Sequence, residues 1–222
     1  MPARLAAAPV VASLGAVVAW TGLIIQFVLS IRLAASRGVA FAESVAVYFG
    51  YFTILTNLLV AVALTTAVVA PGTALRRFFA RSEVATALAT GIAVVGLGYL
   101  ILLRDAWDPE GYALVADVAL HYATPALFLA YWWLSVPKGA LRWRAVPIAA
   151  IYPLAYLVYV LLRGALTGFY PYPFMDVTQI GYAQMLANML GMAAGYLAVA
   201  TALVGLGRAR ARRFRPLTRR LA

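Results

Sequence analysis

The sequence has no cysteine, a single histidine and few charged residues. Without cysteine, the chain cannot form a disulfide framework, a thiolate nucleophile or a cysteine-based metal site. One histidine, His121, also excludes a bis-histidine haem within one chain. Charged residues make up 11% of the 222 residues and hydrophobic residues 65%, with a mean hydropathy of +0.90. Soluble globular domains lie far from these values, so the composition indicates that lipid surrounds most of the chain.

Long apolar runs dominate the sequence. A helix needs about 20 apolar residues to cross a bilayer core of about 30 Å, and six runs approach or exceed this length. They cover residues 9–31, 45–70, 84–103, 115–136, 145–162 and 182–206. The first run is too long for the core of a cleaved signal peptide, and short turn-forming segments separate the runs. We predict an all-α integral membrane protein, a bundle of six transmembrane helices forming one domain over residues 1–222.

Basic residues lie mainly on one side of these runs. That side has 14 of the 18 Lys and Arg residues, and the other side has six of the seven acids. An excess of Lys and Arg in short loops marks the cytoplasmic side, so we predict a multi-pass plasma-membrane protein with both termini in the cytoplasm. The basic tail, residues 207–222, then rests on anionic lipid headgroups. No nucleic-acid partner is expected, and the oligomeric state is left open.

Polar side chains gather near the outer ends of four runs. They are Gln26 in the first run, Thr53, Thr56 and Asn57 in the second, Asp117, His121 and Thr124 in the fourth, and Gln184 and Asn188 in the sixth. At 1.5 Å per residue, Thr53 lies about 12 Å and His121 about 9 Å below the start of its helix. Polar groups in hydrocarbon are costly and usually face the bundle interior. We therefore predict one polar layer near the outer face.

The spacing within this layer suggests acid–base chemistry. Asp117 and His121 are four residues apart and share a helix face, so the carboxylate can hold one imidazole nitrogen while the other accepts a proton. A hydroxyl such as that of Thr53 completes the parts of an activated nucleophile. Side-chain amides can stabilise a developing oxyanion. The amide candidates are Asn57, Asn188, Gln184 and Gln26.

Each of these residues also has a structural reading. Threonine and asparagine in membrane helices often bond to their own backbone or to neighbouring helices. His121 fits a packed core residue, a proton-relay site or a general base, and Asp117 fits an interfacial residue at a helix start. The aromatic segment 166–176 is either an interfacial belt or a lid or acyl-chain groove over the polar layer. The candidates for substrate binding are Thr56, Tyr172, Phe174 and Asp176.

No motif for a metal or a cofactor is present. The sequence has no G-x-S-x-G elbow, no H-E-x-x-H and no Walker loop, which would carry hydrolase, zinc or nucleotide chemistry. We predict no cofactor and no metal site.

Three segments together resemble a known family. They are Tyr-Phe-Thr-Ile-Leu-Thr-Asn at 51–57, Asp-Val-Ala-Leu-His at 117–121, and Thr-Gly at 167–168 followed by Tyr-Pro-Phe-Met-Asp at 172–176. In order and spacing they are similar to the androgen-induced-gene and androgen-dependent TFPI-regulating membrane proteins. The likeness is closer to their prokaryotic six-transmembrane relatives, the Pr-six-Pr type. The resemblance implies a threonine hydrolase that cleaves fatty acid esters of hydroxy fatty acids, with Thr53 and His121 as the catalytic pair. The animal proteins have an acid where this chain has Thr56 and an asparagine where it has Asp117.

Three functional hypotheses follow. The first is an intramembrane threonine-type hydrolase of lipid esters, whose partners are membrane lipids and a lipid ester substrate. The second is a membrane protein that binds or transports a small solute or protons through the same polar layer. The third is a purely structural or assembly membrane protein with a closed outer layer. We expect no polar residue in the inner halves of the six helices to continue a pathway, which favours a blind cavity and the first hypothesis.

Overall fold

The computed structural model describes residues 2–213, with side chains from residue 7 to residue 212. Within this range the chain forms helices and connecting turns, with no strand. Six helices are long and apolar enough to cross a membrane, which confirms the predicted number of spans. They cover Ala7–Ser36, Phe52–Val69, Ser82–Ala106, Gly111–Ser135, Ala145–Thr167 and Val177–Arg212. Of the predicted basic tail, residues 214–222 lie outside the described residues.

Several spans change helix type along their length. Three are mainly single α-helices: α1 (Pro2–Ser36), α3 (Phe52–Val69) and α8 (Ala145–Thr167). The third span joins α5 (Ser82–Gly98) to the π-helical η1 (Tyr99–Leu103), and the fourth joins α6 (Gly111–Val118), the π-helical η3 (Ala119–Ala123) and α7 (Thr124–Ser135). The last, α9 (Val177–Arg213), is kinked at Gly181, which has a φ of 73°. Short elements connect them: α2 (Phe41–Tyr48), α4 (Ala74–Phe79), η2 (Arg104–Ala106), η4 (Lys138–Ala140) and η5 (Pro173–Met175).

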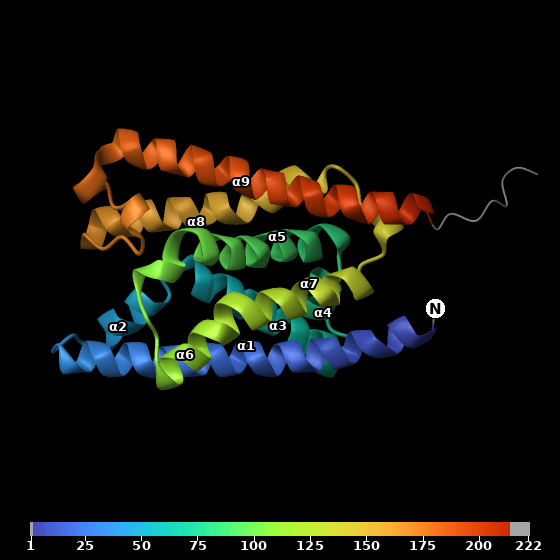
Figure 1. The fold of residues 1–222 in the computed structure, drawn as a ribbon, viewed down its shortest axis with the longest axis horizontal. Coiled ribbons are helices and arrows are strands. Elements are labelled where there is room, and N and C mark those ends of the chain that lie inside the picture. Colours follow the sequence, from blue (N-terminus) through green and yellow to red (C-terminus); the bar gives the residue numbers. More distant parts are fainter. Residues whose placement is uncertain (1, 214–222) are drawn as a thin grey trace, which may run out of the picture.

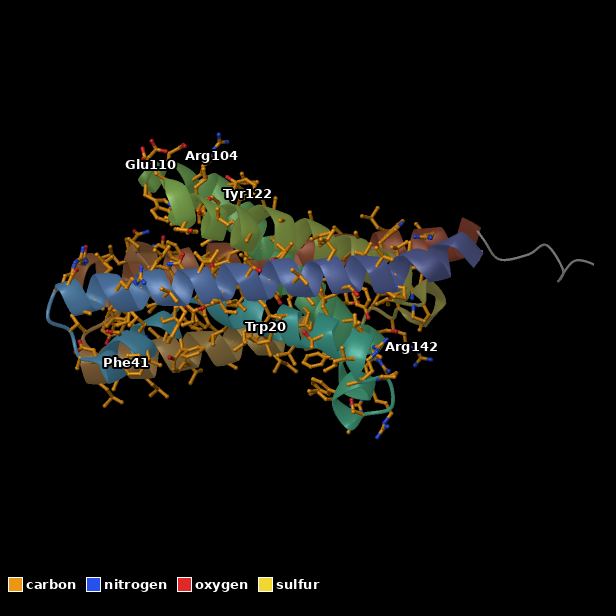
Figure 2. The ribbon with its side chains drawn as sticks, turned by 90° about the horizontal axis from the view of Figure 1, so that it is seen from below. Trp20, Phe41, Arg104, Glu110, Tyr122 and Arg142 are labelled. Atoms are coloured by element: carbon orange, nitrogen blue, oxygen red, sulfur yellow. The ribbon has the colours of Figure 1, made fainter. Side chains whose placement is uncertain are left out.

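The bundle has two distinct ends (Figure 1). The first residues of α1 and the last residues of α9 lie at one end, which we call the terminal end, and the opposite end is called the site end. Helix α1 packs on α3, α6 and α7, while α8 packs on α5 and α9. In Figure 2, Arg142 marks the terminal end, and Phe41, Arg104 and Glu110 mark the site end.

Residues 45–70, predicted as one helix, are divided between α2 and α3. Tyr51 has an extended backbone, with φ −84° and ψ 132°, and precedes the first residue of α3. The carbonyls of Phe49 and Gly50 accept hydrogen bonds from tyrosine hydroxyls of α8, so tertiary contacts satisfy groups that a continuous helix would satisfy internally. The predicted depth of Thr53 is therefore wrong: it is the second residue of α3, not about 12 Å below a helix start.

The terminal half of the bundle does contain polar side chains, contrary to the expectation from sequence. They include the hydroxyls of Thr65, Thr66, Thr86 and Thr90. Each donates to a carbonyl of its own helix, and two of them also accept from the indoles of Trp20 and Trp132 at 3.0 Å. The two hydroxyls that accept from an indole thereby link α3 to α1 and α5 to α7.

Lys138 caps the C-terminal end of α7, at the terminal end of the bundle. Its Nζ donates to the Trp132 carbonyl at 2.7 Å and lies 3.8 Å from the centroid of the Trp132 ring. A cation near the last carbonyls of a helix complements the helix dipole. Burial, and secondarily the positive charge of Arg210, lower the pKa of Lys138 to about 7.

Lys138→Met is expected to remove a pH dependence of stability. Lys138 has an ordinary pKa of 10.5, so between about pH 7 and pH 10 the unfolded chain binds the proton more readily than the folded chain. The free energy of unfolding therefore rises with pH in this window through Lys138. Thermal unfolding in detergent, followed by circular dichroism from pH 7 to pH 9, should show the melting temperature of the wild type rising relative to that of Lys138→Met. A difference that stays constant or falls would contradict the low pKa.

Candidate functional site

Thr53 lies in the first turn of α3, directly after the break. The first backbone N–H groups of a helix have no partner within the helix. Here the Thr53 N–H donates to the Tyr172 hydroxyl oxygen at 3.4 Å, although the two residues are 119 positions apart. Burial raises the pKa of Tyr172, so its hydroxyl keeps its proton. The result is an O–H group held beside the half-buried Thr53.

Tyrosines on one face of α8 hold the start of α3 in place. The Tyr156 hydroxyl donates to the Gly50 carbonyl at 2.9 Å, and the Tyr159 hydroxyl donates to the Phe49 carbonyl at 3.3 Å. One turn earlier, the Tyr152 hydroxyl shares a hydrogen bond of 2.9 Å with that of Thr56. Thr56 is fully buried in this contact and lines neither of the cavities described below. Its hydroxyl therefore joins α3 to α8 next to the site.

Asn57 joins the turn that carries Thr53 to the segment that carries His121. Its Nδ2 donates to the Thr53 carbonyl at 2.9 Å and to the Leu120 carbonyl at 3.2 Å. Both N–H groups of the amide are therefore engaged, so Asn57 is not the predicted oxyanion donor. It instead fixes α3 against η3, since Leu120 is the residue before His121.

His121 and Asp117 form a pair inside the fourth span. His121 Nδ1 lies 3.0 Å from Asp117 Oδ1, and the two side chains are 15% and 4% exposed. Asp117 is buried in the last turn of α6, which argues against the interfacial alternative. With Nδ1 facing the carboxylate, Nε2 is the nitrogen left for another partner.

Tyr99 is a site residue that the sequence analysis missed. Its ring stacks on His121 with centroids 3.9 Å apart and planes 10° apart. Both residues lie in π-helical segments, η1 and η3, and π-turns often mark functional positions in helices. Only the depth of Tyr99 near the end of the third span could have singled it out.

Thr53 and His121 line one cavity at the site end. This outer cavity has a volume of about 600 Å³ and borders α1, α2, α3, η1, η3 and the aromatic loop after α8. Its lining includes Thr53, His121, Tyr99, Tyr172, Gln26 and Arg37. Gln26 donates to Ser30 at 3.2 Å, and within the described residues this predicted candidate has no hydrogen bond to Thr53.

A second cavity begins at the same threonine. It has a volume of about 270 Å³, lies between α5, η1, α8 and α9, and is called the apolar cavity. Its lining includes Phe52, Val94, Leu102, Leu154, Phe174 and Met192. Thr53, Tyr99, Leu103 and Tyr172 border both cavities. The predicted candidate Phe174 thus lines the apolar cavity, and its ring stacks on that of Tyr172 with centroids 5.1 Å apart.

Three predicted candidates lie outside both cavities and order the aromatic loop instead. Gln184 donates to Asn188 at 3.0 Å, and Asn188 donates to the Phe174 carbonyl at 3.0 Å. Asp176 accepts from the Thr178 N–H at 3.0 Å and caps the start of α9. The hydrogen bond from the Thr178 hydroxyl, with others, lowers the pKa of Asp176. None of the three is hydrogen-bonded to Thr53 or His121 in the described part of the chain.

The arrangement joins a hydroxyl, an imidazole–carboxylate pair and a protonated phenol around one cavity. Among residues 2–213, no three His, Asp or Glu side chains are grouped as metal ligands. Comparison with known protein families, characterised proteins and solved structures found no match for this chain.

Proposed function

We propose that this chain is an intramembrane hydrolase of lipid esters, with Thr53 as nucleophile and His121 as general base. The observation that carries the proposal is the shared outer cavity: Thr53 and His121 both line it, and Asp117 Oδ1 lies 3.0 Å from His121 Nδ1. Asn57 bridges the two turns that present these residues. A nucleophile, a base and a group that orients the base are the parts that covalent ester hydrolysis requires.

The chemistry proceeds in two steps. The Thr53 hydroxyl attacks the ester carbonyl carbon while His121 Nε2 accepts its proton. The C–O bond to the alcohol then breaks, and His121 returns the proton to the departing alcohol oxygen, which leaves an acyl-threonine. A water molecule attacks this acyl group and gives a proton to His121. The C–O bond to Thr53 breaks, the threonine oxygen regains a proton, and the fatty acid is released.

Tyr172 is the best-placed donor for the oxyanion. Its oxygen accepts from the Thr53 N–H, which polarises the O–H bond and strengthens its donation to a third group. The start of α3 adds the positive end of a helix dipole. This assignment replaces the side-chain amides proposed from sequence, because Asn57, Gln184 and Asn188 are engaged elsewhere. Gln26, the fourth, lines the outer cavity but donates to Ser30.

The proposed orientation places the site end outside the cytoplasm. The 14 basic residues on the side of the termini support this orientation through the excess of Lys and Arg in cytoplasmic loops. The plasma membrane is the proposed location. A transport function is less well supported, because the threonine hydroxyls of the terminal half are bonded within their own helices.

The test is ester turnover by the full-length protein in lipid nanodiscs. With p-nitrophenyl palmitate, we expect release of nitrophenol and, at short times, a palmitoyl adduct on the peptide that contains Thr53, detected by mass spectrometry. His121→Ala should lose both signals. Absence of turnover and of adduct across a panel of long-chain esters would reject the hydrolase. Proteoliposome solute or proton flux that requires His121 but not Thr53 would favour transport instead.

A further inference from the structure

The two cavities that meet at Thr53 differ in which catalytic group they contact. The outer cavity contains His121, and the apolar cavity does not. In ester cleavage the general acid must reach the oxygen of the departing alcohol. The alcohol part of the substrate therefore lies on the His121 side of Thr53, within the outer cavity.

The acyl part then has one direction left. When the carbonyl carbon is at Thr53 and the alcohol extends toward His121, the acyl chain continues into the apolar cavity between α5, α8 and α9. The walls there are aliphatic, aromatic and thioether side chains such as Val94, Tyr196 and Met189. Methionine adapts its shape to irregular apolar ligands.

The rim of the apolar cavity opens to the outside of the bundle. Leu102, Leu154 and Leu197 line the cavity and are 55%, 58% and 39% exposed. They lie on the third, fifth and sixth spans, whose outward faces meet hydrocarbon. An acyl chain can thus enter sideways from the bilayer without crossing water. The outer cavity is also lined largely by apolar side chains, but it contains Gln26, Arg37 and Glu43, which do not line the apolar cavity.

We infer that the substrate is an ester of a long-chain fatty acid with an alcohol that carries a polar group, bound with its acyl chain in the apolar cavity and its alcohol in the outer cavity. This inference rests on the proposed hydrolase function. It specifies the class of substrate, with the acyl chain and the alcohol each bound in a different cavity. The apolar cavity between α5, α8 and α9 determines which acyl chain lengths fit, and the outer cavity selects the alcohol.

Gly98 offers a clean way to shorten the apolar cavity. It lines this cavity, has ordinary helical angles (φ −63°, ψ −39°), and a Cβ placed there would meet nothing within 4 Å. Gly98→Leu should extend into the cavity, because its Cβ has room at this position. Gly191→Leu is the matched control, since Gly191 is also open to added atoms but does not line the cavity. Ala193→Phe fills the same space from α9.

The experiment compares glycerol monoesters of butyrate, octanoate and palmitate in nanodiscs. We expect Gly98→Leu to lower kcat/KM for the palmitate ester by about tenfold or more, as when a filled apolar pocket excludes methylenes, while the butyrate ester stays within about twofold of the wild type. Ala193→Phe should shift the profile in the same direction, and Gly191→Leu should match the wild type. An unchanged chain-length profile in both cavity variants would overturn the inference while leaving hydrolysis intact.

A binding measurement separates this inference from the hydrolase proposal. Palmitic acid with a photoreactive diazirine near its methyl end should crosslink to residues of the apolar cavity, such as Met189 or Met192, and Gly98→Leu should suppress this labelling. If no ester is turned over but this labelling occurs, the hydrolase proposal fails and the acyl site stands. Labelling confined to the outer cavity would show that the assignment is reversed.

Discussion

Thr53→Ala is expected to lower kcat for a palmitate ester by at least about 10³-fold, the scale seen when a covalent nucleophile is removed. The methyl side chain cannot form the acyl-threonine, so the adduct should vanish as well. Thr53→Ser keeps a hydroxyl at the same carbon and should retain measurable turnover. The fold should survive, because the Thr53 side chain is half-buried and the contact to Tyr172 uses its backbone N–H.

Thr65→Ala is the matched control for this loss. Thr65 is on the same helix, toward the terminal end, where its hydroxyl accepts from the Trp20 indole at 3.0 Å and donates to the Ala61 carbonyl. Its removal should lower stability by about 1 kcal/mol, the usual worth of such a hydrogen bond, without changing the rate of ester cleavage. Wild-type rates in Thr53→Ala, measured by nitrophenol release and by product chromatography, would end the nucleophile assignment.

The six spans could be predicted because their signal is local. About 20 consecutive apolar residues are needed to cross the bilayer core whatever the rest of the chain does, and all six candidates became helices of sufficient length. The break before α3 could not be predicted in the same way. It lies inside an apolar run, and its carbonyls are satisfied by Tyr156 and Tyr159, which are more than 100 residues away.

The polar layer was predicted only in part, because part of its signal is local and part depends on packing. The sequence places polar residues near the same end of several spans even where, as at Thr53, the helix start is misplaced, and the structure brings Thr53, His121 and Gln26 to one cavity. The side of the helix on which a side chain finds its partners depends on how the helices pack. Gln184 and Asn188 lie at a similar depth, but they bond to each other and to the aromatic loop.

The stacking of Tyr99 on His121 could not be predicted from the sequence. Its ring meets the imidazole of His121 because two neighbouring spans each contain a π-turn that shifts the register of the side chains beyond it. Apolar periodicity gives no signal for such a turn, since one extra residue within a long apolar run leaves the run intact.

Asp117→Asn is expected to reduce kcat for the same ester by about 10²–10⁴-fold, with little change in fold, because an amide in place of the carboxylate favours the wrong imidazole tautomer. Asp117 faces His121 Nδ1 at 3.0 Å. A carboxylate there accepts a hydrogen bond and keeps the proton on Nδ1, which leaves Nε2 free to take the Thr53 proton. The amide can donate to Nδ1 instead, and the ring proton then moves to Nε2.

The single histidine makes this tautomer directly observable. His121 is the only histidine in the chain, so selective ¹⁵N labelling gives the imidazole signals of one residue. The wild type should show a protonated Nδ1, and Asp117→Asn a protonated Nε2, in step with the loss of turnover. Asp176→Asn is the control, since Asp176 caps α9 and is hydrogen-bonded to Thr178 and Gln179; it should leave the His121 spectrum unchanged. A changed tautomer with undiminished turnover would show that His121 is not the base, whatever the outcome at Thr53.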